Sequence, residues 1–500
     1  MNRTYVLWVT LLVLVAPASL QGAQLNWMGH WKGGDKRELL VHEVRKQYEF
    51  LHPDVTVNLQ FDVDIEGEGD YYKMKVAHKI VEMITTGRIE WDVVFCDLPV
   101  YNHVADLLGD PLWGQKHLVD FATVPGFLGS QKDFIVNTPY YRERMGGIFA
   151  GPHIEGIVFC LWTTRQVVKK TGIAVKERGM TSDDFLAYAR ALAAYNKEHG
   201  TSIPFLHLSS LNRIEALFEY LFKSQFSDPG LVIEEKYDAS KAKAFLATLE
   251  IFEHLSHYQP LLNADWRTLD WRDCERAFLT GGSLFLPGGT CMYSHFRGVS
   301  PQHYQNGIPV EQPYVKQPNG LVGLFVNAFA VMKRSPNRQA AIDLSMMWAE
   351  PEIAEKWVEY TRNPTGIRGN LQEPVLGLVD GDVYGEFLHD MEQQYSTLPM
   401  RNFRAPTYVF GKGIPVGEEE FRTSLALILE GKLKAKDYYQ TAQGQGLLPD
   451  ACPPEPAVTS QSGVRTRTGC LAHATTTRHP KGEAIPPSYE LPRPGRVFIQ

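Results

Sequence analysis

The sequence predicts an α/β fold in which mostly parallel sheets are flanked by helices. Three observations support this prediction. Apolar stretches with the period of a strand alternate along the chain with stretches of helical period. The stretch 91–97 is apolar almost without interruption, as strands covered by helices on both faces are. The alternation runs from about residue 24 to residue 446, which is too long for one sheet and favours two α/β lobes.

The first five predicted elements follow one another in β-α-β-α-β order. They are a strand that opens at Leu25, a helix after Asp35, a strand over 55–63, a helix over 70–86 and a strand over 91–97. Asp35 and Glu38 have the spacing of a capping box, and Gly87 stands where a helix commonly ends. Apolar and polar residues alternate over 55–63, which predicts a strand with one wetter face.

The same alternation continues in the second half of the chain. Strands are predicted over 147–152, 156–162, 283–289 and 324–332. Thr181 and Asp184 predict the start of a helix that Gly200 closes, and a further helix carries Phe245, Leu249 and Phe252 on one face. Ser335 and Pro336 predict a helix with proline at its first position.

The composition excludes several classes of partner. The formal net charge is −7 and the pI is about 6.2, so there is no basic field to attract nucleic acid or an anionic membrane. Six cysteines in 500 residues give no disulfide framework, and no spacing resembles a metal site. We expect no cofactor. Four cysteines in or beside apolar runs are interpreted as small buried side chains, and pairing of the other two stays open. The four are Cys96, Cys160, Cys274 and Cys291, and the other two are Cys452 and Cys470.

The two ends of the chain differ from the α/β region. Residues 1–23 combine Arg3, an apolar stretch and small residues that end at Ala18 and Ala23, which is typical of a secretory signal peptide. We expect the signal peptide to be removed after Ala18 or Ala23. The apolar stretch is too short to span a bilayer, and no cysteine lies near either cleavage site to carry a lipid anchor. We therefore expect an exported, periplasmic protein. Residues 447–500 are rich in proline without an apolar period, which predicts a disordered tail.

Candidate binding residues follow the ends of the predicted strands, where ligands of open α/β sheets bind. They are Trp27, His30 and Trp31; Asp97 and Tyr101; His153 and Glu155; Gly289, Thr290 and Tyr293; Trp266 and Trp271 in a polar stretch; Asn327; and Arg362. Aromatic faces suit the apolar side of a sugar ring, while charged and amide groups suit its hydroxyls. Glycines let the backbone approach closely. This mixture predicts a carbohydrate ligand.

Several of these residues have a structural interpretation as well. Trp27 and Trp31 either pack in a core or contact a ligand. Asp97 either caps the next helix or contacts the ligand. A histidine such as His153 is as often a structural side chain as a ligand contact. For Glu155 we favour a functional role, because a carboxylate in an apolar stretch needs a partner.

Three segments carry a resemblance to a known family. They are "FVNAFAVMKRSPNRQAAIDLSMMWAEPEIAEKWVEYT" (325–361), "AFLTGGSLFLPGGTCMY" (277–293) and "FRTSLALILEGKLKAKDYYQTAQ" (421–443). By their order and spacing, the chain resembles the extracellular solute-binding proteins (family 1) of ABC sugar importers, the maltose-type periplasmic binding proteins. The similarity covers roughly 24–446. Cys291 departs from the family, which commonly has a tryptophan there, so Tyr293 or Trp266 would have to supply the stacking ring.

The resemblance implies a two-lobe fold of the type II periplasmic-binding-protein class, joined by a hinge of several crossings. The first lobe would comprise 24–151 and 320–362, and the second 152–319 and 363–446. The implied function is non-enzymatic. A monomeric protein captures a sugar or polyol between the lobes, closes on it and delivers it to the membrane subunits of an ABC permease.

Two alternatives remain open from the residues. The same fold could bind a charged small molecule. A polyamine is disfavoured by Arg297, Arg362 and Arg368 near the predicted site, whereas a sugar acid or phosphorylated polyol would suit them. A glycoside hydrolase would use Asp97 and Glu155 as its carboxylate pair, although nothing in the sequence shows their separation.

Overall fold

The computed structural model describes most of the chain up to residue 444. The described ranges are 22–33, 36–68, 72–130, 142, 145–155, 157–209, 212–226, 239–317, 321–323, 329–363, 382–397, 401–402 and 418–444. They all belong to one compact unit, 1–451. Several predicted features lie outside the described residues: 1–21 of the signal peptide, Asp35, Asn327, Arg368, both C-terminal cysteines and the tail over 447–500.

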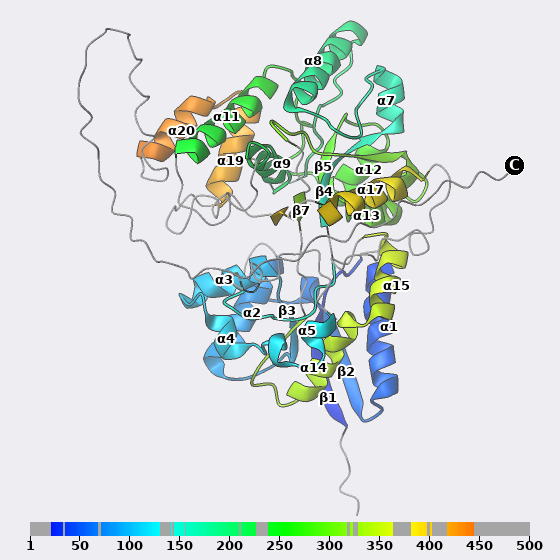
Figure 1. The fold of residues 1–500 in the computed structure, drawn as a ribbon, viewed down its shortest axis with the longest axis vertical. Coiled ribbons are helices and arrows are strands. Elements are labelled where there is room, and N and C mark those ends of the chain that lie inside the picture. The colour runs from blue at the N-terminus through cyan, green and yellow to red at the C-terminus, as the bar shows by residue number, and fades with distance from the viewer. Residues whose placement is uncertain are drawn as a thin grey trace, which may run out of the picture. The chain divides into compact units, whose positions relative to one another are not determined.

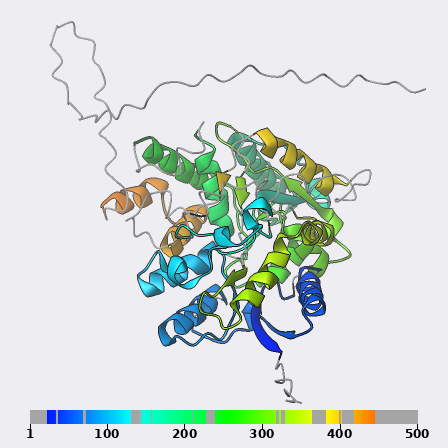
Figure 2. The ribbon, with the colours of Figure 1, turned by 60° about the horizontal axis from the view of Figure 1, so that its bottom comes forward.

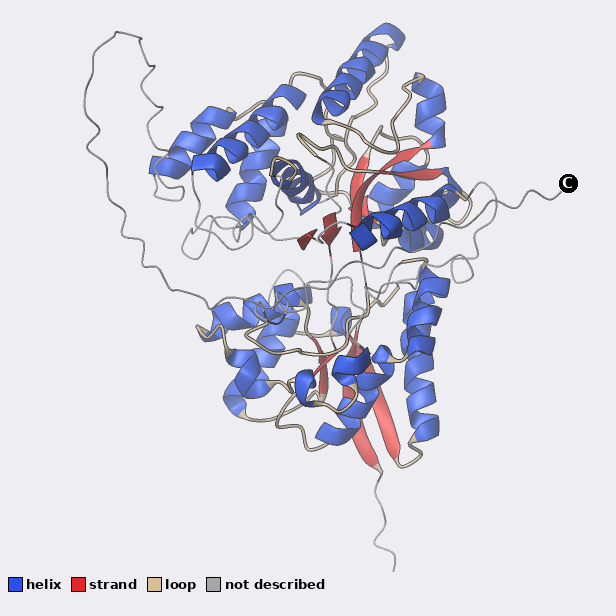
Figure 3. Ribbon diagram, in the orientation of Figure 1, coloured by secondary structure: helices blue, strands red, loops and turns tan. Residues whose placement is uncertain are grey.

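The first sheet has the strand order β2-β1-β3-β8. Its strands are β1 (Ala23–Gly29), β2 (Val55–Phe61), β3 (Val93–Phe95) and β8 (Phe329–Val331). The pairs β1–β2 and β1–β3 are parallel, with Trp27 opposite Leu59 and Val93, and β3–β8 is antiparallel. The β-α-β-α-β prediction for residues 25–97 is therefore confirmed (Figure 3).

Helices cover both faces of this sheet (Figure 1). They are α1 (Lys36–Leu51), α2 (Tyr72–Thr86), α3 (Leu98–Leu108), α4 (Trp113–His117), α5 (Phe127–Ser130), α14 (Arg338–Met346) and α15 (Pro351–Thr361), with short 3-10 turns at Asp62–Asp64, Phe121–Thr123 and Met347–Ala349. Although they are distant in sequence, α1 and α15 lie side by side (Figures 1 and 2), where the Tyr360 hydroxyl donates to Glu43 at 2.9 Å. Pro351 occupies the first turn of α15, as expected for a residue without an N–H group.

The second sheet is built around β4 (Ile157–Thr164). The other strands are β5 (Leu286–Gly289), β6 (Gly307–Val310), β7 (Leu321–Gly323) and β9 (Arg401–Asn402). β5, β6 and β7 are antiparallel to β4, and β7 is parallel to β9. Isolated parallel bridges also join Leu206 to Leu262 and Phe285. This sheet is therefore mixed and mostly antiparallel, whereas two of the three strand pairs in the first sheet are parallel.

Further helices surround the second sheet. They are α7 (Arg165–Thr171), α8 (Ser182–His199), α9 (Asn212–Lys223), α11 (Ala239–Leu255), α12 (Trp271–Leu279), α13 (Met292–Val299), α17 (Val383–Thr397), α19 (Glu418–Leu429) and α20 (Ala435–Gly444), with a 3-10 turn at Tyr304–Asn306. Two cores result. One includes Trp27, Phe95 and Trp357 around the first sheet, and the other includes Phe185 and Phe245 around the second.

The predicted strand over 147–152 is wrong, because this stretch forms turns. Gly146 and Gly147 have φ values of +68° and +89°, which suit a glycine turn and not a strand. The Phe149 backbone groups, which a sheet would have paired, bind a separate segment around Asp120 instead. Phe149 donates its N–H to Asp120 at 3.1 Å and accepts from Phe121 at 2.8 Å.

The helix predicted from Ser335 and Pro336 begins two residues later, at Arg338. The Ser335 hydroxyl donates to Asp92 at 2.5 Å and accepts from the Asn337 N–H at 2.9 Å. This turn binds the chain to the end of the first sheet before the helix starts. Pro336 is therefore part of the turn and not of the helix.

The predicted start and end of α8 and the burial of three of the four cysteines are confirmed. Thr181 and Asp184 form a complete capping box on α8, and Gly200 ends that helix with a φ of +62°. Cys96, Cys160 and Cys274 are buried, while Cys291 is half-buried and all four are free thiols. Among the described residues, no helix combines the length and hydropathy required to cross a bilayer.

Candidate functional site

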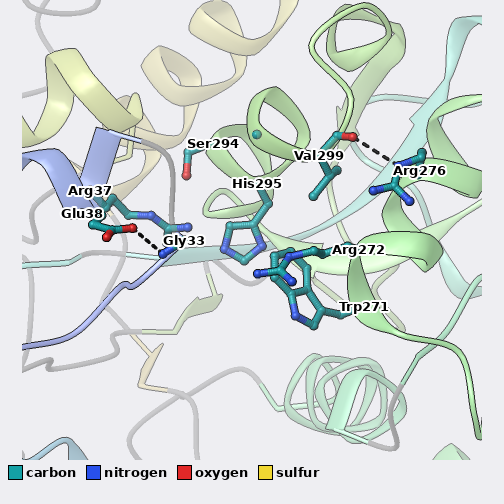
Figure 4. A pocket seen from close by; sticks show the side chains of 10 residues that line it. Gly33, Arg37, Glu38, Trp271, Arg272, Arg276, Ser294, His295 and Val299 are labelled. Atoms are coloured by element: carbon teal, nitrogen blue, oxygen red, sulfur yellow. Dashed lines mark hydrogen bonds between the residues drawn. The ribbon is translucent and has the colours of Figure 1, made fainter. Parts of the chain in front are cut away.

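A cavity of about 370 Å³ brings together segments that are far apart in the sequence. Its lining residues are Gly33, Arg37, Glu38, Trp271, Arg272, Arg276, Ser294, His295, Gly298 and Val299 (Figure 4). The first three come from the turn after β1 and from α1, beside the first sheet, and the others come from α12 and α13, beside the second sheet. The cavity therefore has one wall from each of the two α/β layers.

The turn after β1 shapes the first wall. Trp31 and Gly33 have φ values of +71° and +69°, which are in the left-handed region found in turns. The Gly33 N–H donates to Glu38 at 2.6 Å, which fixes the first turn of α1 beside it. Arg37 and Glu38 consequently line the cavity from the start of the helix.

Glu155 joins this turn to the segment that leads into β4. Its carboxylate accepts from the Trp31 indole N–H at 3.3 Å and lies 3.6 Å from the Arg37 guanidinium. Trp31 is 6% exposed and Glu155 is 4% exposed, so the three side chains form a buried cluster behind the cavity wall. The partner that the sequence analysis required for Glu155 is present.

The opposite wall is formed by Trp271, Arg272 and His295. The Arg272 guanidinium lies over the Trp271 ring, 4.9 Å from its centroid, and the His295 ring centroid is 5.1 Å from that of Trp271. Asp270 caps α12 by accepting from the Arg272 N–H at 2.9 Å, which places Trp271 and Arg272 at the first turn of the helix. Figure 4 shows His295 between Arg37 and the Trp271–Arg272 pair.

Three of the predicted contact residues lie inside the first core. Trp27 is completely buried and packs edge-on against Phe329 at 5.1 Å. Asp97 caps α3 through the Val100 N–H at 2.9 Å and accepts from the Lys73 ammonium at 2.5 Å. Tyr101 is also buried, and its hydroxyl donates to the Pro111 carbonyl at 3.0 Å.

The two candidate histidines have structural neighbours. His30 stacks on Phe95 with ring centroids 4.0 Å apart, and its Nδ1 is 2.6 Å from an Asp62 oxygen. His153 is buried two residues before Glu155, and this burial lowers the pKa of its imidazole to about 3. The imidazole of His153 is therefore neutral near pH 7.

Trp266 lies apart from the cavity, in the second core. Its indole N–H donates to Glu430 at 3.3 Å, and the Arg267 guanidinium covers its ring at 4.2 Å. Because Trp266 packs in the second core and does not line the cavity, it is not placed to substitute for the tryptophan missing at Cys291. Burial raises the pKa of Cys291 to about 12, so this thiol stays protonated.

Tyr293 and Arg362 belong to a cluster that joins α13, α15 and α17. The rings of Tyr293 and Tyr384 stack 4.0 Å apart, and Arg362 donates to the Tyr293 hydroxyl at 3.3 Å. The Thr290 carbonyl oxygen accepts from Tyr384 at 3.0 Å. In β5, the Gly289 carbonyl oxygen accepts from the Trp162 indole at 3.1 Å.

Of the predicted residues that the structure describes, only Trp271 lines the cavity, with Trp31 and Glu155 directly behind it. The sequence analysis missed Arg37, Arg272, Ser294 and His295. Arg272 directly follows a candidate aromatic residue, so its position gave one usable indication. Ser294 likewise follows the candidate Tyr293, whereas Arg37 and His295 lie within helices and adjoin no candidate residue. Among the described residues, no group of three metal-binding side chains comes together.

Comparisons with known proteins identify the fold. No protein-family model and no curated protein sequence matches the chain. Solved structures do match over 83–86% of it. MsmE from Bacillus subtilis, in an open conformation, is 17% identical and aligns over 86% of this chain and 98% of its own, with a TM-score of 0.56.

Two further structures were solved with bound sugars. An ABC transporter solute-binding protein from Thermotoga lettingae, bound with α-D-tagatose, is 16% identical over 85% of this chain and 99% of its own, with a TM-score of 0.59. The GacH receptor of Streptomyces glaucescens, solved unliganded and with acarbose, is 13% identical. It aligns over 86% of this chain and 99% of its own, with a TM-score of 0.61. This chain has the solute-binding-protein fold. Within the solute-binding-protein fold, the two sheets described above correspond to the expected α/β lobes.

Proposed function

We propose that the protein is the substrate-binding component of an ABC transporter and captures a sugar or related polyol between its two α/β lobes. The observation that carries this proposal is the cavity of about 370 Å³ whose walls come from α1 on one side and from α12 and α13 on the other. Its volume falls within the range of about 300–1,000 Å³ typical of small-molecule sites. Trp271 supplies an aromatic surface, and charged side chains supply hydrogen-bonding groups.

Binding across two walls gives a mechanism for signalling the loaded state. A ligand that touches both walls binds best when they are close, so it shifts the population toward a closed form. A membrane permease would recognise that form. No covalent chemistry is needed, and the engagement of Asp97 by Lys73 and the α3 N-terminus disfavours the glycosidase alternative.

Export and monomeric state belong to the same proposal. Within residues 1–23, the segment up to Ala18 would serve as the signal peptide and direct the protein to the periplasm. Ala23 is the first residue of β1 and pairs with Val55, so cleavage after Ala18 leaves the strand whole. N-terminal sequencing of the exported protein should begin at Ser19.

Trp271→Ala tests the proposed site. In a thermal-shift and calorimetry screen against mono- and oligosaccharides, sugar acids and polyamines, we expect a carbohydrate to stabilise the protein through mass action. Removing the indole should weaken that binding about tenfold or more, as truncation of a central aromatic contact does. The melting temperature of the ligand-free protein should change little, because Trp271 is only half-buried.

Phe50→Ala is the matched control, since Phe50 is an aromatic residue that is 84% exposed near the end of α1 and outside the cavity. It should leave affinity unchanged. A protein that binds no carbohydrate, or that releases reducing ends from oligosaccharides, would refute the proposed function.

A further inference from the structure

The polar groups of the cavity are mostly hydrogen-bond donors. Arg37, Arg272, Arg276, Ser294 and His295 all carry donor groups in its lining. Among the lining residues that the structure describes, Glu38 is the one carboxylate, and it already accepts from the Gly33 N–H at 2.6 Å. A ligand in this cavity therefore meets many donors and few available acceptors.

Most of the basic side chains in this lining have a carboxylate neighbour within the protein. Arg37 lies beside Glu155, and Arg276 pairs with Asp273. His295 Nδ1 is 3.4 Å from a Glu275 oxygen. These neighbours leave Arg272 as the exception.

Arg272 carries an uncompensated charge at the cavity. Within the described part of the chain, its guanidinium makes no ion pair and no side-chain hydrogen bond; it rests on the Trp271 ring. It also reaches the opposite wall, because a Cβ atom added to Gly33 would lie 3.3 Å from its Nη2. Arg272 thus spans from α12 toward the turn after β1 (Figure 4).

Ser294 provides a second and independent observation. Its side chain is 1% exposed, lines the cavity, and within the described residues its hydroxyl has no hydrogen-bond partner. A buried hydroxyl without a partner is unfavourable, so a cavity-lining one is suited to a bond with a ligand. Both observations call for a ligand that offers acceptor atoms and negative charge.

We infer that this cavity selects carbohydrates that carry an anionic group, a carboxylate or a phosphate, with Arg272 and Ser294 as the specificity-determining residues. The inference rests on the proposed function and specifies its ligand class. A guanidinium binds either oxyanion with two parallel hydrogen bonds, and the serine hydroxyl donates a third. Trp271 then contacts the sugar ring beside the charged group.

The experiment compares matched ligands on the full-length protein. Glucose, glucuronate, glucose 6-phosphate and glucosamine differ in charge on one ring, and the galactose and mannose series repeat the comparison. Inorganic phosphate and acetate test the anion alone. We expect a hexuronate or a hexose phosphate to bind at least tenfold more tightly than its neutral parent, and the better of the two identifies the oxyanion.

Variants assign the effect to the two residues. Arg272→Gln should weaken binding of the charged sugar about tenfold to a hundredfold, the usual range for a lost hydrogen bond to a charged group, and the neutral parent by less than threefold. Arg190→Gln, on the exposed face of α8, is the charge-matched control and should bind as the wild type does. Ser294→Ala should weaken charged-sugar binding while leaving the ligand-free melting temperature unchanged or higher, a combination that a purely structural serine would not give.

The outcomes separate the two proposals. Neutral sugars that bind as tightly as their acids would overturn the anionic preference and leave the sugar-binding function in place. Inorganic phosphate that binds as tightly as the sugar phosphate would overturn the role of the sugar ring. If no carbohydrate of any charge stabilises the protein, the proposed function fails, and this inference fails with it.

Discussion

At the scale of single residues, Trp31 holds together the turn behind the cavity. It adopts a φ of +71°, which is uncommon for a large side chain, and its ring packs 4.8 Å from Trp357 and 5.8 Å from Trp348. The indole N–H also binds Glu155. This packing makes Trp31 a positioning residue for Glu155 and Arg37, with little surface left for a ligand.

Trp31→Ala should therefore destabilise the fold as well as the site. Truncation of a buried tryptophan costs about 3–5 kcal/mol of unfolding free energy. Trp31→Phe keeps most of the packing and loses the bond to Glu155, so it should cost less than half as much. Urea unfolding monitored by circular dichroism measures both, with the half-buried Trp271→Ala as control. Equal stability of Trp31→Ala and Trp271→Ala would show that Trp31 is not a core residue.

Because the pKa of His153 is lowered, we expect the protein to lose stability in acid. Burial lowers the pKa of this imidazole from 6.5 to about 3, so between these values the unfolded chain binds a proton that the folded chain does not. Above pH 6.5 the imidazole is neutral in both states, so His153 does not reduce the free energy of unfolding. As the pH falls from 6.5 toward 3, the free energy of unfolding decreases by up to about 1.4 kcal/mol per pH unit.

His153→Gln should accordingly show a shallower fall of unfolding free energy between pH 7 and pH 4.5 than the wild type. Urea titrations at several pH values measure the two slopes, and His199→Gln on the exposed end of α8 controls for removal of an imidazole. Parallel profiles for wild type and His153→Gln would contradict a buried neutral imidazole.

Residue identity alone could not sort the candidate contacts. Trp27, Trp31 and Trp266 have the same chemistry as Trp271, yet only Trp271 lies in the cavity wall. What separates them is the packing of residues distant in sequence, such as Phe329 against Trp27 and Glu430 against Trp266. Asp97 was the more predictable case, because its place before α3 already indicated a cap.

At the scale of elements, local hydrogen bonds explain which predictions succeeded. The capping box of α8 and the glycines that end helices act within a few residues, so the sequence shows them directly. The stretch 147–152 fails as a strand because its partners, Asp120 and Phe121, lie on a separate segment of the first lobe. Periodicity cannot reveal such a partner.

Thr181→Ala tests the capping box of α8. The Thr181 hydroxyl accepts from the Asp184 N–H at 3.1 Å, and the Asp184 carboxylate accepts from the Thr181 N–H at 3.0 Å. Loss of the hydroxyl should lower the free energy of unfolding by about 0.5–2 kcal/mol. Thr85→Ala, on the exposed side of α2, removes the same group without a cap and should have almost no effect. Equal losses would mean that the cap contributes nothing.

At the scale of the whole molecule, the site depends on contacts between segments separated by more than 200 residues. One cavity wall comes from Gly33, Arg37 and Glu38, and the other from residues between Trp271 and Val299. The order of elements was sufficient to predict two α/β lobes, since connections and strand periods are local features. Which helix ends face each other is set by how the lobes pack, and the sequence order does not contain that information.

Tyr384 provides the test at this scale, because it joins elements of both layers. Its buried hydroxyl lies 3.0 Å from the Thr290 carbonyl oxygen, after β5, and 3.0 Å from that of Arg362, at the end of α15. The Asn363 side-chain oxygen is a third acceptor at 3.2 Å, and the hydroxyl donates to one of these acceptors at a time. Tyr384→Phe leaves both buried carbonyl groups without this donor and should lower the free energy of unfolding by about 1–3 kcal/mol.

Tyr360→Phe is the control, since the Tyr360 hydroxyl donates to Glu43 at a more exposed position between α1 and α15, within the first layer. It should cost less than Tyr384→Phe in urea unfolding. Because the Tyr384 contact connects the end of α15 to the start of α13, which carries Ser294 and His295, Tyr384→Phe should also weaken ligand binding. A Tyr384→Phe protein with wild-type stability and affinity would show that the two layers are held in register by other contacts.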